Sequence, residues 1–212
     1  MIVLSGTIGA GKSTLTKMLA DHLGTQAFYE TVDDNAILKM FYADPQKYGF
    51  LLQVYFMNKR LGYIQQAQTN ALDILDRSIF EDALLFKLNA DLGRATDTEV
   101  EIHQALLENM MENLPGVASK DPDLLIYIRV SFETMLKRIE LRGRDFEQVA
   151  QDPSLYEYYQ TLTSRYDAWF ESYNRSPKMV IDGDRLDFVT EELARTEVLA
   201  AIDNKLTQLG LR

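Results

Sequence analysis

The residues most suited to chemistry lie near the start of this 212-residue chain, where Gly6 to Ser13 read G-T-I-G-A-G-K-S. This is the spacing of a phosphate-binding loop, in which backbone N–H groups surround an anion at the start of a helix. In such a loop Lys12 reaches the β- and γ-phosphates, and the Ser13 hydroxyl holds Mg²⁺. An apolar run before the motif and an amphipathic run after it support this interpretation. The sequence therefore predicts a nucleoside triphosphate site.

A second candidate is Glu30, which ends an apolar run beside Tyr29 and precedes the acidic pair Asp33-Asp34. A carboxylate opposite the phosphate loop could accept the proton of an attacking hydroxyl, or orient that hydroxyl for in-line transfer. The alternative is a solvated acidic residue at the end of a strand. The placement of Glu30 relative to the loop favours the catalytic interpretation.

The triplet Asp76-Arg77-Ser78 follows another apolar run. An acid at the end of a buried strand near a phosphate loop can order Mg²⁺, directly or through water. Arg77 could neutralise charge on the transferred phosphoryl group or form a bidentate pair with Glu30. Ser78 and Glu81 fit a capping box, which predicts a helix start. The alternative for the triplet is a surface ion pair at that helix start.

A cluster of arginines surrounds Gly143. Arg138 and Arg142 are four residues apart, so they share one helix face, and Arg144 follows in a polar loop. Guanidinium groups on a closing flap would suit phosphates during transfer, when charge spreads over their oxygens. The alternative is the usual enrichment of basic residues at helix C-termini. Three arginines around a glycine favour the flap.

Gln53, Met57 and Arg60 are spaced to share one helix face. An amide, a soft apolar side chain and a cation could read a planar heterocycle. On spacing alone, however, a buried helix edge with an ordinary ion pair is the better interpretation.

His22 and His103 lack paired metal-ligand spacing, so no metal site built from protein ligands alone is predicted.

Short apolar runs alternate with helical patterns along the chain, which predicts an α/β fold with a five-stranded parallel sheet flanked by helices. Ligands collect at the carboxyl ends of such strands, and the candidate residues follow the apolar runs as this rule requires. The predicted strands are Ile2–Ser5, Ala27–Glu30, Ala71–Leu75, Leu124–Val130 and Met179–Ile181. The predicted helices are Lys12–His22, Asn35–Tyr42, Lys47–Thr69, Ile79–Ala90, Glu99–Leu114, Phe132–Leu141, Ser154–Tyr173 and Glu191–Leu209.

The composition favours one soluble α/β domain over residues 1–212, with 46% hydrophobic residues and no linker-like stretch. A net charge of −10 argues against a nucleic-acid polymer or an anionic membrane as partner. The absence of cysteine fits a reducing compartment, and no signal peptide or membrane-spanning run is found, so we expect a cytoplasmic enzyme.

Taken in order, the motifs resemble those of the P-loop deoxyribonucleoside kinases, and among them the deoxyadenosine and deoxyguanosine kinases of lactic-acid bacteria. The resemblance spans essentially the whole chain. Besides the phosphate loop, it rests on Phe28-Tyr29-Glu30, the stretches 41–45, 50–56 and 76–82, Lys137-Arg138-Ile139 leading into Arg142-Gly143-Arg144, and the stretch 181–184. Two departures are Thr7, where relatives usually have Pro, and Asp rather than Glu at position 76.

The resemblance implies a role for each matching residue. The acceptor set comprises Glu30 and Arg77 at the 5′-hydroxyl, Gln53, Arg60 and Asp82 at the base, and Tyr42, Glu147 and Tyr158 around the sugar. The donor set comprises Gly6, Thr7, Ile8, Gly9, Ala10, Gly11, Lys12, Ser13 and Thr14, with Arg138, Arg142 and Arg144 over the phosphates and Asp184 and Arg185 near the adenine. Ser13 and Asp76 would hold the metal. Glu30, Asp76, Arg77, Lys12 and Arg142 would form the catalytic group.

The activity implied by this resemblance is ATP- and Mg²⁺-dependent phosphorylation of the 5′-hydroxyl of a deoxynucleoside, with a purine favoured. It also implies an arginine-rich LID over residues 142–152, and a homodimer or a heterodimer with a sister subunit.

A thymidylate-type nucleoside monophosphate kinase is the alternative enzyme, although Glu30 would repel the phosphate of a monophosphate acceptor. A nucleotide-gated binding module is the non-enzymatic alternative, but a sensor needs no acceptor pocket.

Overall fold

The fold is built on a parallel sheet, described here from a computed structural model that covers residues 1–29, 36–67, 70–113 and 121–212. Five strands pair in the order β2-β3-β1-β4-β5, and every pairing is parallel. The strands are β1 (Ile2–Ser5), β2 (Ala27–Phe28), β3 (Ile74–Leu75), β4 (Leu124–Arg129) and β5 (Lys178–Asp182). The predicted five-stranded parallel α/β sheet is therefore confirmed.

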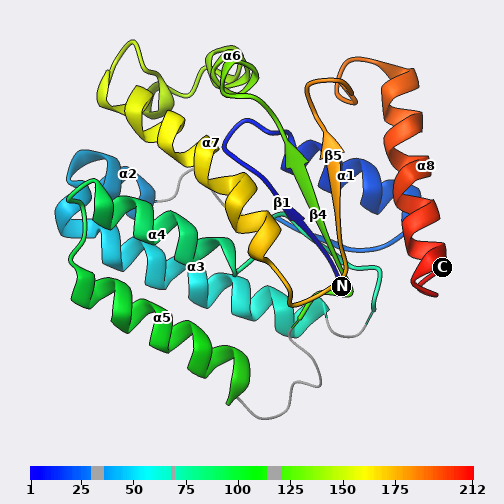
Figure 1. The fold of residues 1–212 in the computed structure, drawn as a ribbon, viewed down its shortest axis with the longest axis horizontal. Coiled ribbons are helices and arrows are strands. Elements are labelled where there is room, and N and C mark those ends of the chain that lie inside the picture. The colour runs from blue at the N-terminus through cyan, green and yellow to red at the C-terminus, as the bar shows by residue number, and fades with distance from the viewer. Residues whose placement is uncertain (30–35, 68–69, 114–120) are drawn as a thin grey trace.

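Helices cover both faces of the sheet (Figure 1). They are α1 (Lys12–Leu23), α2 (Ala36–Ala43), α3 (Pro45–Ala67), α4 (Glu81–Asp91), α5 (Asp97–Glu112), α6 (Phe132–Arg142), α7 (Ser154–Ser172) and α8 (Glu192–Gln208), with a 3₁₀ turn at Asp145–Glu147. In Figure 1, α1 and α8 lie on one side of the strands, whereas α3, α4 and α5 lie on the other. Within the described part of the chain, no helix combines the length and apolar composition needed to cross a membrane.

Alternating side chains of β1 divide the core into two layers. Ile2 and Leu4 are fully buried among residues of α1 and α8, whereas Val3 packs with residues of α3 and α5. A strand covered on both faces must be apolar throughout, which explains why β1 and β4 read as continuous hydrophobic runs. This burial fixes the carboxyl end of β1, from which the phosphate loop leaves the sheet.

Several helix boundaries differ from the predicted ones for local reasons. Helix α3 begins at Pro45, two residues earlier than predicted, and Asp44 Oδ1 accepts a hydrogen bond from Lys47 N at 3.2 Å. An acid followed by proline is a helix-start signal that the prediction overlooked. A capping box forms between Thr96 and Glu99, so α5 starts directly after Thr96 at Asp97, two residues before the predicted start at Glu99.

The capping box predicted at Ser78 is only half formed. Glu81 accepts a hydrogen bond from Ser78 N, but Ser78 Oγ accepts one from Phe80 N, so α4 starts at Glu81 rather than Ile79. The preceding strand is also shorter than the predicted Ala71–Leu75. A turn closed by Asp73 N on Asn70 O leaves only Ile74 and Leu75 in β3.

Candidate active site

The phosphate loop leaves β1 and enters α1, as predicted. Gly6 has φ 149°, and a Cβ atom there would lie 2.8 Å from the carbonyl oxygen of Ile128, so only glycine fits this close approach. Lys12 Nζ lies across the loop and donates to Gly6 O and Thr7 O, both at 2.8 Å. The ammonium group is thus held within the concave loop, where it can meet a phosphate.

A cavity of about 730 Å³ opens beside this loop. The predicted residues that line it are Ile8, Gly9, Gly11, Lys12, Ser13, Thr14, Tyr42, Gln53, Arg60, Asp76, Arg77, Asp82, Arg138, Arg142, Arg144, Glu147 and Tyr158. Gly6, Thr7 and Ala10 belong to the loop behind them. Residues that are far apart in the sequence therefore share one cavity, whose size suits organic ligands.

Beside the cavity, the phosphate loop contacts the turn that follows β3. Ser13 Oγ donates a hydrogen bond to Asp76 Oδ2 at 2.5 Å, and Asp76 is 4% exposed. A hydroxyl and a carboxylate are oxygen ligands of the kind that Mg²⁺ prefers. In the described ranges, no three His, Cys, Asp or Glu side chains cluster as they would around a metal ion.

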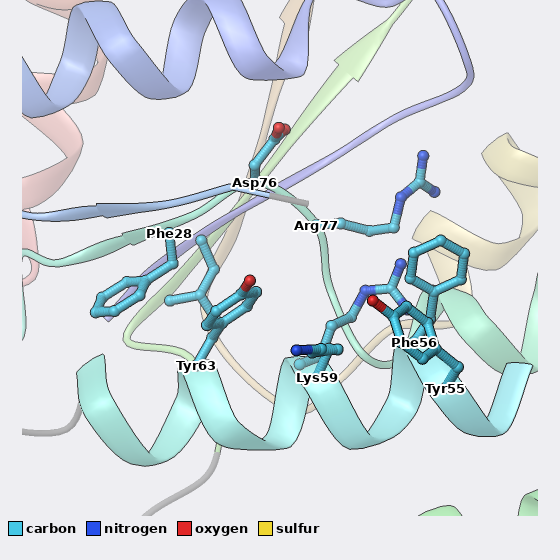
Figure 2. A pocket seen from close by; sticks show the side chains of 9 residues that line it. Phe28, Tyr55, Phe56, Lys59, Tyr63, Asp76 and Arg77 are labelled. Carbon is cyan, nitrogen blue, oxygen red and sulfur yellow. The ribbon is translucent and has the colours of Figure 1, made fainter. Parts of the chain in front are cut away.

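Arg77 extends from the same turn toward α7 (Figure 2). Its Nη1 atom donates to the Tyr166 hydroxyl at 3.2 Å and lies 3.6 Å from the Glu81 carboxylate. In Figure 2 Asp76 points away from the α3 side chains Lys59 and Tyr63. A small pocket between this turn and α3 is lined by Phe28, Tyr55, Phe56, Lys59, Arg60, Tyr63, Leu75, Asp76 and Arg77.

The predicted base-reading residues also line the main cavity. Arg60 Nη1 donates to Asp82 Oδ1 at 2.5 Å, and the two side chains are 6% and 1% exposed. Gln53 is 5% exposed, and its Oε1 atom accepts no hydrogen bond from any described residue. A buried amide oxygen facing a cavity needs a partner, and a ligand N–H group would satisfy it.

Tyr42 and Glu147 both line the cavity, and Glu147 belongs to the segment that follows α6. The Tyr42 ring lies 5.0 Å from that of Phe146, and burial beside Tyr159 raises the pKa of Tyr42 well above its ordinary value. The phenol therefore stays protonated and can donate a hydrogen bond. Glu147 forms ion pairs with Arg142 and, at 3.6 Å, with Arg144. These contacts tie the predicted flap arginines to an acid that also faces the cavity.

Three predicted donor-site residues make other contacts. Arg138 lines the cavity but donates to Ala10 O at 3.2 Å and Gly183 O at 2.8 Å, which ties α6 to the phosphate loop and to the turn after β5. Asp184 accepts from Ser131 N at 2.8 Å, at the start of α6. Arg185 is paired with Glu197 at 2.6 Å and is exposed. Neither Asp184 nor Arg185 is among the residues that line the cavity, and their role near the adenine stays a prediction.

Several cavity residues were not predicted. Asp187, Val189 and Thr190 line the cavity after β5, where Asp187 accepts hydrogen bonds from Thr190 that lower the pKa of the carboxyl group. The rule that ligands gather beyond strand ends pointed to this segment, but not to these positions. Asn89 also lines the cavity, seven residues after Asp82 on the same face of α4. Glu30 lies outside the described residues.

Comparison with known proteins decides the family. A family model described as deoxynucleoside kinase matches residues 2–208. The chain belongs to the deoxynucleoside kinase family. A deoxyadenosine kinase of Lactobacillus acidophilus is 58% identical over 99% of this chain and 98% of its own length. A deoxyguanosine kinase of Lactobacillus johnsonii is 55% identical over 99% of this chain and 94% of its own length.

Solved structures agree with this membership. A deoxyadenosine kinase from M. mycoides with dCMP and dCDP bound has a TM-score of 0.77 and 30% identity, and the match covers 98% of both chains. The same enzyme with dATP bound also has a TM-score of 0.77 and 30% identity, over 97% of this chain and 98% of that one. The predicted P-loop kinase fold, the resemblance and the kinase activity on deoxynucleosides are thus confirmed. A nucleotide as phosphate donor is supported in the same way.

Proposed function

We propose that the protein transfers the γ-phosphoryl group of ATP to the 5′-hydroxyl of a purine deoxynucleoside. The observation that carries the proposal is a single cavity lined both by Lys12 and Ser13 of the phosphate loop and by Gln53 and Arg60 of α3. The donor triphosphate binds at the phosphate loop, and the acceptor base binds beside the Gln53 amide. Between them, the sugar hydroxyl is held in line with the transferred group, and such positioning supplies much of phosphoryl-transfer catalysis.

In this proposal the charges of the chain divide into donor and acceptor groups. Lys12, Arg142 and Arg144 neutralise the charge that develops on the donor phosphates during transfer. Arg77 contacts the 5′-hydroxyl region. Glu30 accepts or orients the proton of the hydroxyl. Ser13 and Asp76 fit Mg²⁺, which when bound would neutralise phosphate charge.

Base recognition rests on Gln53 and on the Arg60–Asp82 pair. The Gln53 amide offers both a donor and an acceptor to the edge of a planar base. Arg60 and Asp82 hold each other in a buried geometry, so they present fixed polar groups to the base. The purine preference is supported by the relatives named deoxyadenosine kinase and deoxyguanosine kinase.

The sugar would contact Tyr42, Glu147 and Tyr158. Tyr42 and Glu147 offer a donor and an acceptor to the 3′-hydroxyl, and aromatic packing near the sugar leaves little room for a 2′-hydroxyl. Deoxyribose selection follows from that crowding. The LID over residues 142–152 would carry Glu147 and the flap arginines toward the ligands when it closes.

A coupled assay tests the reaction against the alternative of a thymidylate-type kinase. Purified protein is supplied with ATP, Mg²⁺ and either deoxynucleosides or their 5′-monophosphates. Turnover with deoxyadenosine or deoxyguanosine, and little with the monophosphates or with ribonucleosides, is expected. Turnover with monophosphates alone would overturn the proposal, and kcat/KM values across the four deoxynucleosides would establish the base preference.

We also propose that the enzyme is a dimer, formed with itself or with a sister subunit, and that it works in the cytoplasm. Leu51 on α3 and Ile102 on α5 are 45% and 51% exposed, and such apolar side chains favour helix packing between subunits. The lack of cysteine fits a reducing compartment. Light scattering of the purified chain tests self-association, since a homodimer has twice the mass of the chain.

A further inference from the structure

Glu81, which the sequence marked only as a capping residue, makes contacts on both sides of the active site. Its side chain is fully buried, with 0% exposure. Oε1 accepts hydrogen bonds from Gly6 N at 3.2 Å and from the Tyr166 hydroxyl at 2.8 Å, while Oε2 accepts one from Ser78 N at 2.9 Å. One carboxylate thus joins the start of the phosphate loop, the turn after β3 and helix α7.

The same carboxylate reaches Arg77. Arg77 Nη1 lies 3.6 Å from Glu81 Oε1 and donates to the Tyr166 hydroxyl at 3.2 Å. Tyr166 is fully buried, and burial beside Glu81 raises its pKa well above the ordinary value, so its hydroxyl remains a donor. Arg77 is therefore held by a fixed hydroxyl and a fixed charge, while it also lines the main cavity.

We propose that Glu81 is a positioning residue that fixes Arg77 relative to the phosphate loop. This inference rests on the proposed function, because Arg77 acts at the acceptor hydroxyl and Gly6 begins the loop that holds the donor. The carboxylate joins the two groups directly, so their separation is set by hydrogen bonds within one buried cluster. Tyr166 supports the Arg77 side of this connection and does not contact the loop.

The need for a carboxylate follows from its three donors. In Glu81→Gln, one amide oxygen can still accept from Gly6 N and from Tyr166. The new NH₂ group then faces Ser78 N–H, which is also a donor, and the negative charge beside Arg77 is lost. In Tyr166→Phe, the ring remains and only the hydroxyl between Arg77 and Glu81 is removed.

The matched control is Asp73→Asn. Asp73 is a buried carboxylate, 4% exposed, that accepts from Thr25 Oγ1 at 2.5 Å and Gln26 N at 3.2 Å. It precedes β3, whereas Glu81 lies beyond its carboxyl end, and it does not line the cavity. The same chemical change is thus made at a buried site away from the reacting groups. All variants are checked for folding by thermal unfolding.

Two measurements test the proposal, namely ATP affinity by titration without acceptor and kcat for deoxyadenosine. Glu81→Gln is expected to weaken ATP binding by about 3-fold or more and to lower kcat by about 10- to 100-fold, the scale of a small misplacement of reacting groups. Tyr166→Phe is expected to lower kcat while ATP affinity stays near that of the parent enzyme. Asp73→Asn is expected to change neither.

A double-mutant cycle with Arg77→Lys separates positioning from a general loss of stability. If Glu81 acts through Arg77, the double variant loses less kcat than the product of the two single losses. Multiplicative losses, or unchanged ATP affinity and kcat in Glu81→Gln, would overturn the proposal. If Glu81→Gln does not fold, the same cycle is measured with Tyr166→Phe and Arg77→Lys. Multiplicative losses of kcat in that cycle would then overturn the proposal. A parent enzyme that turns over no deoxynucleoside would instead refute the proposed function, and the ATP titrations would still judge the contact with the loop.

Discussion

Ser13 Oγ lies 2.5 Å from Asp76 Oδ2, so the phosphate loop and the turn after β3 meet at a hydroxyl–carboxylate contact. The two residues are 63 positions apart in the sequence, and the parallel pairing of β1 with β3 brings their carboxyl ends together. The contact places side by side the hydroxyl and the carboxylate that the proposed function assigns to Mg²⁺. Asp76 is thus hydrogen-bonded directly to the phosphate loop, although an aspartate side chain is shorter than that of glutamate.

Asp76→Asn is expected to lower kcat by about 100-fold and to raise the Mg²⁺ concentration needed for half-maximal rate, because an amide oxygen carries no net charge to hold a cation. Initial rates across a Mg²⁺ series measure both effects. Asp73→Asn, three residues away on the other side of β3, is the control. An Asp76→Asn enzyme with the parent Mg²⁺ dependence would remove Asp76 from the metal site.

The buried Arg60–Asp82 pair predicts a large and asymmetric effect on stability. Asp82→Ala should lower the free energy of unfolding by about 3–5 kcal/mol, because it leaves a guanidinium group buried without its carboxylate. Replacing both residues, as in Arg60→Leu with Asp82→Ala, should restore much of that loss. Urea unfolding of the single and double variants measures the difference.

The exposed pair Lys17–Asp21 is the control for this experiment, since its side chains are 70% and 69% exposed. Asp21→Ala should change the unfolding free energy far less than Asp82→Ala does, because water screens the pair. Equal effects at the two sites would contradict the importance assigned to burial. KM for deoxyadenosine should rise in Asp82→Ala and stay unchanged in Asp21→Ala.

Arg142 is expected to act on the rate more than on acceptor binding. Arg142→Gln should lower kcat by about 100-fold with a smaller change in KM for the deoxynucleoside, since charge on the donor phosphates grows as the reaction proceeds. Steady-state kinetics with each substrate varied in turn checks this. The control is Arg165→Gln, because Arg165 on α7 also pairs with an acid, Asp91 at 2.5 Å, but does not line the cavity. Equal losses in both variants would contradict a role at the phosphates.

The sequence was most informative where a function depends on local order. The phosphate loop requires fixed glycine and lysine spacing, and strands buried on both faces require continuous apolar runs, so both could be predicted. Asp76 and Arg77 could be found because they follow a strand directly. Their partners could not be found in this way, since contacts such as Arg77 with Tyr166 depend on how α7 packs against the sheet.

Glu81 shows why local patterns were misleading at one point. Its spacing from Ser78 fits a capping box, and the Glu81–Ser78 N bond of that box does form. The second carboxylate oxygen, however, binds Gly6 N, 75 residues away, and no local rule predicts that contact. Asp187, Val189 and Thr190 were not predicted, because the resemblance implied donor contacts after β5 only for Asp184 and Arg185.

His103 predicts how stability changes in mild acid. It lies on α5 at 1% exposure, with its ring 5.0 Å from that of Phe86, and burial together with the charge of Arg60 lowers its pKa to about 4. In the unfolded chain the pKa returns to about 6.5, so between these values the unfolded state binds more protons than the folded state. Stability from this group is therefore complete above pH 6.5 and falls by up to about 3 kcal/mol as the pH drops to 4.

His103→Phe should flatten this part of the pH profile, because the variant has no imidazole to protonate on unfolding. Urea unfolding at pH 7 and at pH 4.5 measures the difference for each protein. His22→Gln is the control for the loss of a histidine at the surface, since His22 is 30% exposed and contacts Asp203. If the parent and His103→Phe lose the same free energy between pH 7 and pH 4.5, His103 is not buried in its neutral form, and other groups on the chain must account for the acid sensitivity.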